Sequence, residues 1–127
     1  RHLRTYLISP TSEFVTLCRQ VAMSFYDNAK VKITDISVQK NDYVDILADI
    51  ETAKWFDVVL FRFIRGTGQV GELVLREQNS RIKEVRAGRG FCLTAGSFTE
   101  TAHAYVEARL IDLLDKEKLV KVFDRLD

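Results

Sequence analysis

The sequence predicts an α/β fold, because its hydrophobic periodicity changes from helix-like to strand-like and back along 127 residues. The expected order of elements is α-β-β-β-α-β-α-β-α. Two observations support it: an apolar stripe of helical spacing before residue 30, and three β-branched and aromatic runs of period two between residues 31 and 64. With 46% hydrophobic residues, a chain of this length can bury one core, so we expect a single domain over residues 1–127.

The first predicted helix covers Ser9 to Asn28. Its apolar residues recur at spacings of three and four and would form one buried face: Phe14, Leu17, Cys18, Val21, Ala22 and Phe25. Ser9 is expected as the N-cap and Pro10 as the first helical residue, because the missing N–H of proline is not needed there. His2 is expected to be terminal and mobile.

Three strands are predicted next, over Val31 to Val38, Tyr43 to Ile50 and Phe56 to Ile64. Lys40 to Asp42 is expected to be the turn between the first two strands, and Thr52 to Lys54 the turn between the second and third. Because both connections have the length of a hairpin loop, this part of the sheet should be antiparallel.

Gly66 to Gly68 is expected to end the third strand, and a helix should follow between Gly71 and Ala87. Four residues could share its apolar face: Val74, Arg81, Ile82 and Val85. The run Leu73 to Leu75 can also be interpreted as a fourth strand.

A short buried strand is predicted from Gly90 to Ala95. The run Ser97 to Glu100 has the pattern of a capping box, so a helix should start there and end near Glu107. Leu110 to Leu114 is expected to form the last strand, and Asp115 should cap a final helix. The apolar residues of that helix are Leu119, Val122, Phe123 and Leu126.

Composition limits the classes of partner. Lys and Arg total 19 against 18 for Asp and Glu, so the formal net charge of +1 does not favour nucleic acid, and DNA binding would need a local basic patch. No apolar run approaches the roughly 20 residues of a membrane span. Cys18 and Cys92 lie in apolar runs, as expected of buried, reduced thiols. We expect a soluble cytoplasmic domain without membrane insertion and, because it begins at Arg1, part of a longer protein.

The segment Gly90 to Thr99 (GFCLTAGSFT) resembles the Mrr-like restriction endonuclease family, in which an apolar strand is followed by a Phe-Thr pair that opens a helix. Ile111 to Leu119 continues the match to the family run Ile-x-Leu-Ile-Asp-Gly-x-x-Leu, with Lys116 in place of the glycine. The resemblance spans nearly the whole chain. It implies a restriction-endonuclease-like three-layer α/β/α sandwich with a central mixed sheet.

The same resemblance implies a PD-(D/E)xK nuclease site on two strands. Val44 to Ala48 is similar to a strand whose Asp is a metal ligand, so Asp45 would take that role. The next strand of the family carries a Gln or Glu and a Lys at two catalytic positions, where this sequence has Leu60 and Arg62. The acidic position of the family's first helix falls on Val15, two residues after Glu13.

Cleavage by this superfamily is implied to need Mg²⁺ held by oxygen ligands. Leu60 offers no side-chain oxygen and Arg62 is a permanent cation, which leaves Asp45 as a lone ligand. We therefore expect no cofactor and no cleavage, with Mg²⁺ only if the site is active. Migrated carboxylates from Asp57 or Glu77 could rescue a metal site. The alternative is that Asp45, with the other acidic residues of its strand, Asp49 and Glu51, forms a solvated strand face.

Arg62 and Arg65 are candidate phosphate contacts, and Thr94, Ser97 and Thr99 could add hydroxyls at a helix N-terminus. A plain helix cap explains the hydroxyls equally well. Further cations could extend the patch, or could form an ordinary solvated helix face: Arg76, Arg81, Lys83, Arg86 and Arg89.

Three hypotheses follow from these residues. The first is a nuclease-fold domain that no longer cleaves and binds double-stranded DNA or other domains of the parent protein. The second is an active Mrr-type DNA endonuclease with migrated carboxylates. The third is a structural domain, for example a homodimerisation module, without a role in nucleic-acid binding.

Overall fold

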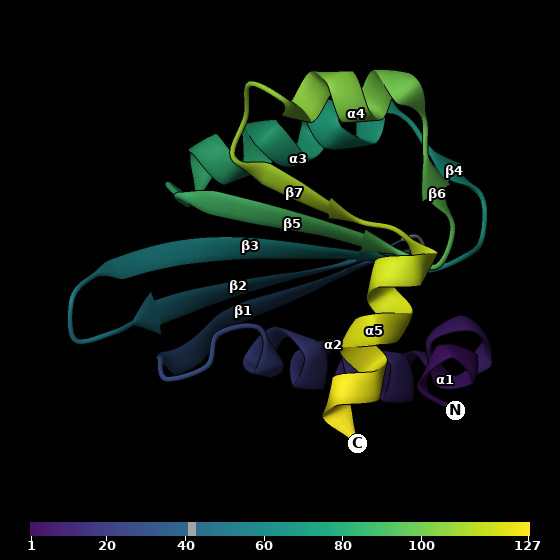
Figure 1. Cartoon of the computed structure of the whole chain (residues 1–127), viewed down its shortest axis with the longest axis horizontal. Helices are drawn as coiled ribbons and strands as arrows, with labels where there is room; N and C mark the ends of the chain where they lie inside the picture. Colours follow the sequence, from purple (N-terminus) through teal and green to yellow (C-terminus); the bar gives the residue numbers. More distant parts are fainter. Residues whose placement is uncertain (41–42) are drawn as a thin grey trace.

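The computed structural model describes residues 1–40 and 43–127, so the predicted turn at Lys40 to Asp42 lies partly outside the described residues. Figure 1 shows a central sheet between two layers of helices. The elements in chain order are α1 (His2–Ile8), α2 (Thr11–Ser24), β1 (Lys30–Gln39), β2 (Tyr43–Glu51), β3 (Phe56–Ile64), β4 (Gln69–Val70), α3 (Glu72–Glu84), β5 (Arg89–Thr94), β6 (Ser97–Phe98), α4 (Glu100–Val106), β7 (Ile111–Leu114) and α5 (Lys116–Leu126).

The main sheet is mixed, with the strand order β1-β2-β3-β5-β7. The first three strands pair antiparallel, as their hairpin-length connections predict, whereas β5 and β7 join in parallel after helical crossovers. The short strands β4 and β6 pair with each other in a separate two-stranded sheet. The predicted order of elements is confirmed, with α1, β4 and β6 as additions.

Two cores lie on opposite faces of the sheet. The larger core joins α1, α2 and α5 to one face, and its largest buried side chains include Tyr6, Phe61 and Phe63. The smaller core joins α3 and α4 to the other face through Leu60, Leu75 and neighbouring apolar residues. In Figure 1, α3 and α4 lie above the sheet and α1, α2 and α5 below it. The predicted three-layer α/β/α sandwich is therefore confirmed.

The N-terminal region corrects the sequence prediction. Residues His2 to Ile8 form α1, a helix that the sequence did not predict. His2 was expected to be mobile, but it belongs to this helix and its Nε2 lies 2.9 Å from Oδ1 of Asp127. Pro10 is the N-cap of α2, and Thr11 is its first helical residue. Ser9 instead follows the end of α1, where its hydroxyl donates to the carbonyl of Thr5. The predicted apolar face of α2 is confirmed, since Phe14, Leu17, Cys18, Val21 and Ala22 are buried.

The helix predicted after Gly71 is confirmed as α3, which excludes a strand at Leu73 to Leu75. Its buried residues are Leu75, Gln78 and Ile82, of which only Ile82 was predicted for the buried face. The prediction of a capping box that starts at Ser97 is wrong, because Ser97 belongs to β6. Thr99 caps α4 instead, with its hydroxyl accepting from the amide of Ala102 at 3.1 Å. Within the described residues, no helix is both long and apolar enough to cross a bilayer.

A buried arginine–carboxylate cluster at the candidate active site

Asp45 and Arg62 stand directly opposite each other on β2 and β3. The antiparallel register places both side chains on the face covered by α3, because alternate residues of a strand share a face. Nε of Arg62 donates to Oδ1 of Asp45 at 2.8 Å, and Nη2 donates to Oδ2 at 2.8 Å. The two residues are only 6% and 1% exposed. They form a buried, two-pronged ion pair, the strongest geometry for an arginine and a carboxylate.

Three further groups surround the same guanidinium. Nη1 of Arg62 donates to Oε1 of Glu77 on α3 and to the carbonyl of Val74 at 3.4 Å. The guanidinium carbon lies 4.1 Å from the centre of the Tyr43 ring, within reach of a cation–π interaction. Arg62 therefore connects β2, β3 and α3. The side chain of Glu77 is 57% exposed, so the cluster meets solvent on that side.

The charges in the cluster stabilise the protonated arginine. Burial alone would lower the pKa of Arg62, but the hydrogen bonds and charges of Asp45, and then those of Glu77, outweigh it. The net effect raises the pKa of Arg62 further above that of an ordinary arginine. The guanidinium cannot serve as a general base here, in agreement with the expectation from sequence.

Leu60 takes the position where the resemblance implies an oxygen ligand. It is 2% exposed and packs in the smaller core with Ile82, Cys92 and other apolar residues. A hydrocarbon offers nothing to a divalent cation, which needs several oxygen ligands. Both oxygens of Asp45 already accept hydrogen bonds from Arg62. As folded, this donor set does not suit Mg²⁺, and among the described residues no group of three or more His, Cys, Asp or Glu could hold a metal ion.

The structure separates the two alternative carboxylates that the sequence suggested. Glu77 reaches the cluster through Arg62. Asp57 pairs with Ile50 near the other end of the hairpin, five residues before Arg62 on β3, or about 16 Å along an extended strand. The carboxylate of Asp57 accepts from the amide of Val58 at 2.7 Å. Asp57 therefore cannot share a metal ion with Asp45 in this conformation.

Arg65 is the second predicted phosphate contact, and the structure places it against α1. Its Nε donates to the carbonyl of Tyr6 at 2.6 Å, and Nη2 donates to the carbonyl of Ser9. Its guanidinium carbon lies 4.7 Å from the centre of the Phe14 ring. These carbonyls at the end of a helix have no intrahelical partner, so Arg65 acts as a side-chain cap for α1.

The three residues predicted to contribute hydroxyls do not converge on one point. Thr94 is 1% exposed, and its hydroxyl accepts from the amide of Gly96 at 3.0 Å. Thr99 caps α4, and Ser97 is an exposed residue of β6. The hydroxyls of Thr94 and Thr99 therefore stabilise local backbone, as the alternative interpretation of the sequence anticipated.

Most of the other predicted cations are neutralised by acidic neighbours. Ion pairs join Arg76 to Glu72, Arg81 to Glu84 and Arg89 to Asp112. Lys83 and Arg86 are exposed near the end of α3. The predicted basic patch is thus mostly an ordinary solvated face with paired charges.

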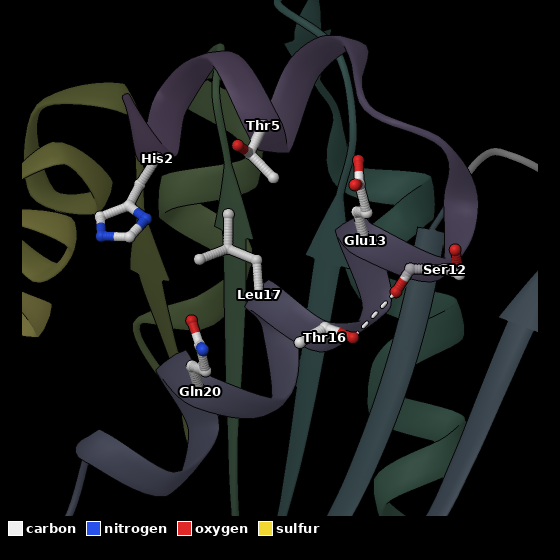
Figure 2. Close-up of a pocket in the computed structure, with 7 residues that line it drawn as sticks. All are labelled: His2, Thr5, Ser12, Glu13, Thr16, Leu17 and Gln20. Atoms are coloured by element: carbon white, nitrogen blue, oxygen red, sulfur yellow. Dashed lines mark hydrogen bonds between the residues drawn. The ribbon is translucent and has the colours of Figure 1, made fainter.

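Glu13, two residues before the acidic position of the family's first helix, lies outside the cluster. Figure 2 shows it with Thr5, Thr16 and Leu17 around a pocket of about 350 Å³ between α1 and α2. None of the described contacts of Arg62 involves Glu13. The structure therefore completes the cluster from α3 and not from α2.

Sequence reasoning missed two members of the cluster. Tyr43 could have been found, because it lies on the same strand face as Asp45, two residues away. The carbonyl of Val74 could not, because only the packing of α3 against the sheet brings it to Arg62.

Comparison with known proteins agrees with this fold. The family model Mrr_cat, a restriction endonuclease domain, matches residues 10–123. The DNA modification-dependent restriction endonuclease AspBHI has a TM-score of 0.64 at 16% identity, with 98% of this chain and 33% of that chain covered. The MspJI restriction endonuclease, solved with a 27-mer oligonucleotide, has a TM-score of 0.64 at 19% identity, with 89% and 27% covered.

A third structure, the protein of unknown function AF1548, has a TM-score of 0.53 at 16% identity and covers 86% of this chain and 64% of that one. A search of curated proteins gave no match. This chain spans a third or less of the two restriction endonucleases, and identities this low show a common fold alone. The family match over residues 10–123 is stronger, and it establishes that the chain belongs to the Mrr_cat restriction endonuclease family.

Proposed function

We propose that this domain binds double-stranded DNA through a nuclease fold that no longer cleaves it. The observation that carries the proposal is the ion pair between Arg62 and Asp45, which engages both carboxylate oxygens at 2.8 Å. A resident guanidinium supplies the positive charge that a metal ion would otherwise bring, but it cannot activate a water molecule. Leu60 removes a second oxygen from the same face.

A DNA partner is supported by the family and by the enzymes of similar fold, one of which was solved with an oligonucleotide. The near-neutral charge of the chain limits the expected affinity, so binding should be weak and should decrease steeply with salt. Other domains of a longer protein would then supply additional DNA contacts and sequence recognition.

The first experiment tests cleavage. Purified protein is incubated with supercoiled plasmid and Mg²⁺ or Mn²⁺, and we expect no nicked or linear product. The matched variant Leu60→Gln/Arg62→Lys returns the residue types implied by the family, so it should gain Mn²⁺ binding in calorimetry. Nicking by the unmodified chain that stops in Asp45→Ala would contradict the proposal.

The second experiment tests DNA binding. Fluorescence anisotropy with a 20-base-pair duplex should show binding at low salt that is largely lost between about 50 and 200 mM salt. If the protein does not bind at the lowest salt, the third hypothesis, a structural or oligomerising domain, replaces the proposed one. Sedimentation analysis of the same sample then reports whether the chain forms a homodimer.

One observation favours a second candidate function, an active metal-dependent endonuclease. Glu77 lies on the far side of the same guanidinium as Asp45, so displacement of Arg62 would leave two carboxylates close together. Such an enzyme would bind Mn²⁺ in its unmodified form, with the site lost in both Asp45→Ala and Glu77→Gln. Calorimetric silence of the unmodified chain excludes this candidate.

A further inference from the structure

The contacts of Arg62 fall into two classes that differ in how easily they break. The contact with Asp45 is two-pronged and buried, since the Asp45 side chain is 8% exposed. The contact with Glu77 uses one guanidinium nitrogen, and the Glu77 side chain is 57% exposed. An exposed carboxylate can exchange its ion pair for water at little cost, whereas a buried one cannot. Glu77 is therefore the releasable partner of the cluster.

Release of Glu77 would leave one hydrogen-bond donor of the guanidinium without its carboxylate acceptor. Nη1 would keep only the carbonyl of Val74, at the long distance of 3.4 Å. Arginine suits an anion with several oxygens, because its planar donors match carboxylate and phosphate geometry equally well. The group that best replaces a carboxylate here is therefore a phosphate oxygen.

The charges near Glu77 favour such an exchange. One guanidinium against the carboxylates of Asp45 and Glu77 leaves the closed cluster with a net negative charge, which repels DNA. Departure of Glu77 removes that excess.

We infer that Glu77 is an autoinhibitory phosphate mimic, and that a phosphate of double-stranded DNA displaces it to bind Nη1 of Arg62. This inference rests on the proposed function and deepens it, because it assigns one phosphate site and the contact that closes it. The buried pair of Asp45 and Arg62 stays intact throughout, and it presents the outer edge of the guanidinium to the ligand.

The test compares two variants that remove the same charge from the same helix. Glu77→Gln opens the proposed site, and Glu84→Gln is the matched control, because Glu84 pairs with Arg81 at the surface and does not contact Arg62. Affinity for a 20-base-pair duplex is measured by anisotropy over a range of salt concentrations. Glu77→Gln should bind about three- to tenfold more tightly, because the phosphate no longer has to displace a carboxylate. The slope of its salt dependence should stay close to that of the unmodified chain, because the same phosphate contact forms in both proteins. Glu84→Gln should change affinity by less than about twofold, because Glu84 does not occupy the guanidinium of Arg62.

Equal gains in the two variants would overturn the inference, because they would reflect only the loss of a negative charge. An unchanged affinity in Glu77→Gln would overturn it as well. The gain must also disappear in the background Asp45→Asn/Arg62→Met, where no guanidinium remains, with circular dichroism used to confirm that this variant is folded. Persistence of the gain there would place the new contact elsewhere.

A second measurement separates this inference from the proposed function. Inorganic phosphate is titrated into Glu77→Gln while the Nε–H signal of Arg62 is followed by NMR. If no variant binds DNA but phosphate shifts this signal, the proposed function fails and the phosphate site stands. If phosphate leaves the signal unchanged in Glu77→Gln, the site is refuted whether or not DNA binds.

Discussion

Replacement of Arg62 by Met is expected to destabilise the domain strongly, because it leaves the buried carboxylate of Asp45 without its partner. Removing one member of a buried ion pair typically costs about 3–5 kcal/mol. The entropy of unfolding of a 127-residue chain is about 0.27 kcal/mol/K, at roughly 2.1 cal/mol/K per residue. The melting temperature should therefore fall by about 11–19 °C.

The double variant Asp45→Asn/Arg62→Met should recover most of this loss. It removes both charges, and the exposed side chain of Glu77 can turn towards water. Buried ion pairs replaced as a unit are often close to neutral. Urea unfolding followed by circular dichroism gives the free energy of unfolding of the original chain, both single variants and the double variant.

A cost below about 1 kcal/mol for Arg62→Met would refute the reasoning, because so small a loss is typical of a surface ion pair. A double variant that is no more stable than Arg62→Met would also refute it. That result would mean that the unpaired charge of Asp45 is not the origin of the loss.

Three further predictions concern the scaffold. Gly96→Ala should lower the free energy of unfolding by about 1–3 kcal/mol in a thermal melt, because an added Cβ would lie 2.0 Å from the carbonyl oxygen of Gly68. The control is Gly68→Ala, which should change stability little, because no atom lies within 4 Å of its added Cβ. Thr99→Ala should lower the free energy of unfolding by about 1 kcal/mol, because it removes the cap of α4. An equal loss in Ser97→Ala would contradict this assignment and support the capping box predicted from sequence. Burial raises the pKa of Cys92 to about 12 and also raises the pKa of Cys18. Neither thiol should therefore react with a disulfide reagent at pH 8 unless denaturant is added. Rapid labelling of the native protein would contradict this burial.

The sequence predicted those elements whose residues form their own local pattern. The three antiparallel strands have alternating apolar residues and short connections, so both their positions and their pairing followed. Helix α1 has seven residues, of which only Tyr6 is buried, and no side-chain cap at its N-terminus. Its stability comes from distant groups, such as Arg65 at its last carbonyls and the hydroxyl of Tyr6, which donates to the carbonyl of Ile64 at 2.7 Å. No local pattern could have revealed it.

The candidate site was predictable up to its two strands. Leu60 and Arg62 are two residues apart on one strand, so their common face followed from the strand period. The position of Asp45 on that face, directly opposite Arg62, depends on the register, which the length of the turn would have fixed. The choice between Glu77 and Asp57 required the position of α3 over the sheet. The start of α4 was predicted at Ser97 because Ser97 fits the capping-box motif, but the backbone of Ser97 pairs with β4 and the cap is Thr99.

The contact between the two chain ends has a practical consequence. The guanidinium of Arg1 lies 3.0 Å from the carboxylate of Asp127, and the ring of His2 reaches the same carboxylate. A linker of a few residues could therefore close the chain into a ring, and new ends could be opened at an exposed connection such as Ala53 to Trp55. Circular permutants of this kind should retain the sandwich, and the domain could be inserted into a surface loop of a host protein without being stretched.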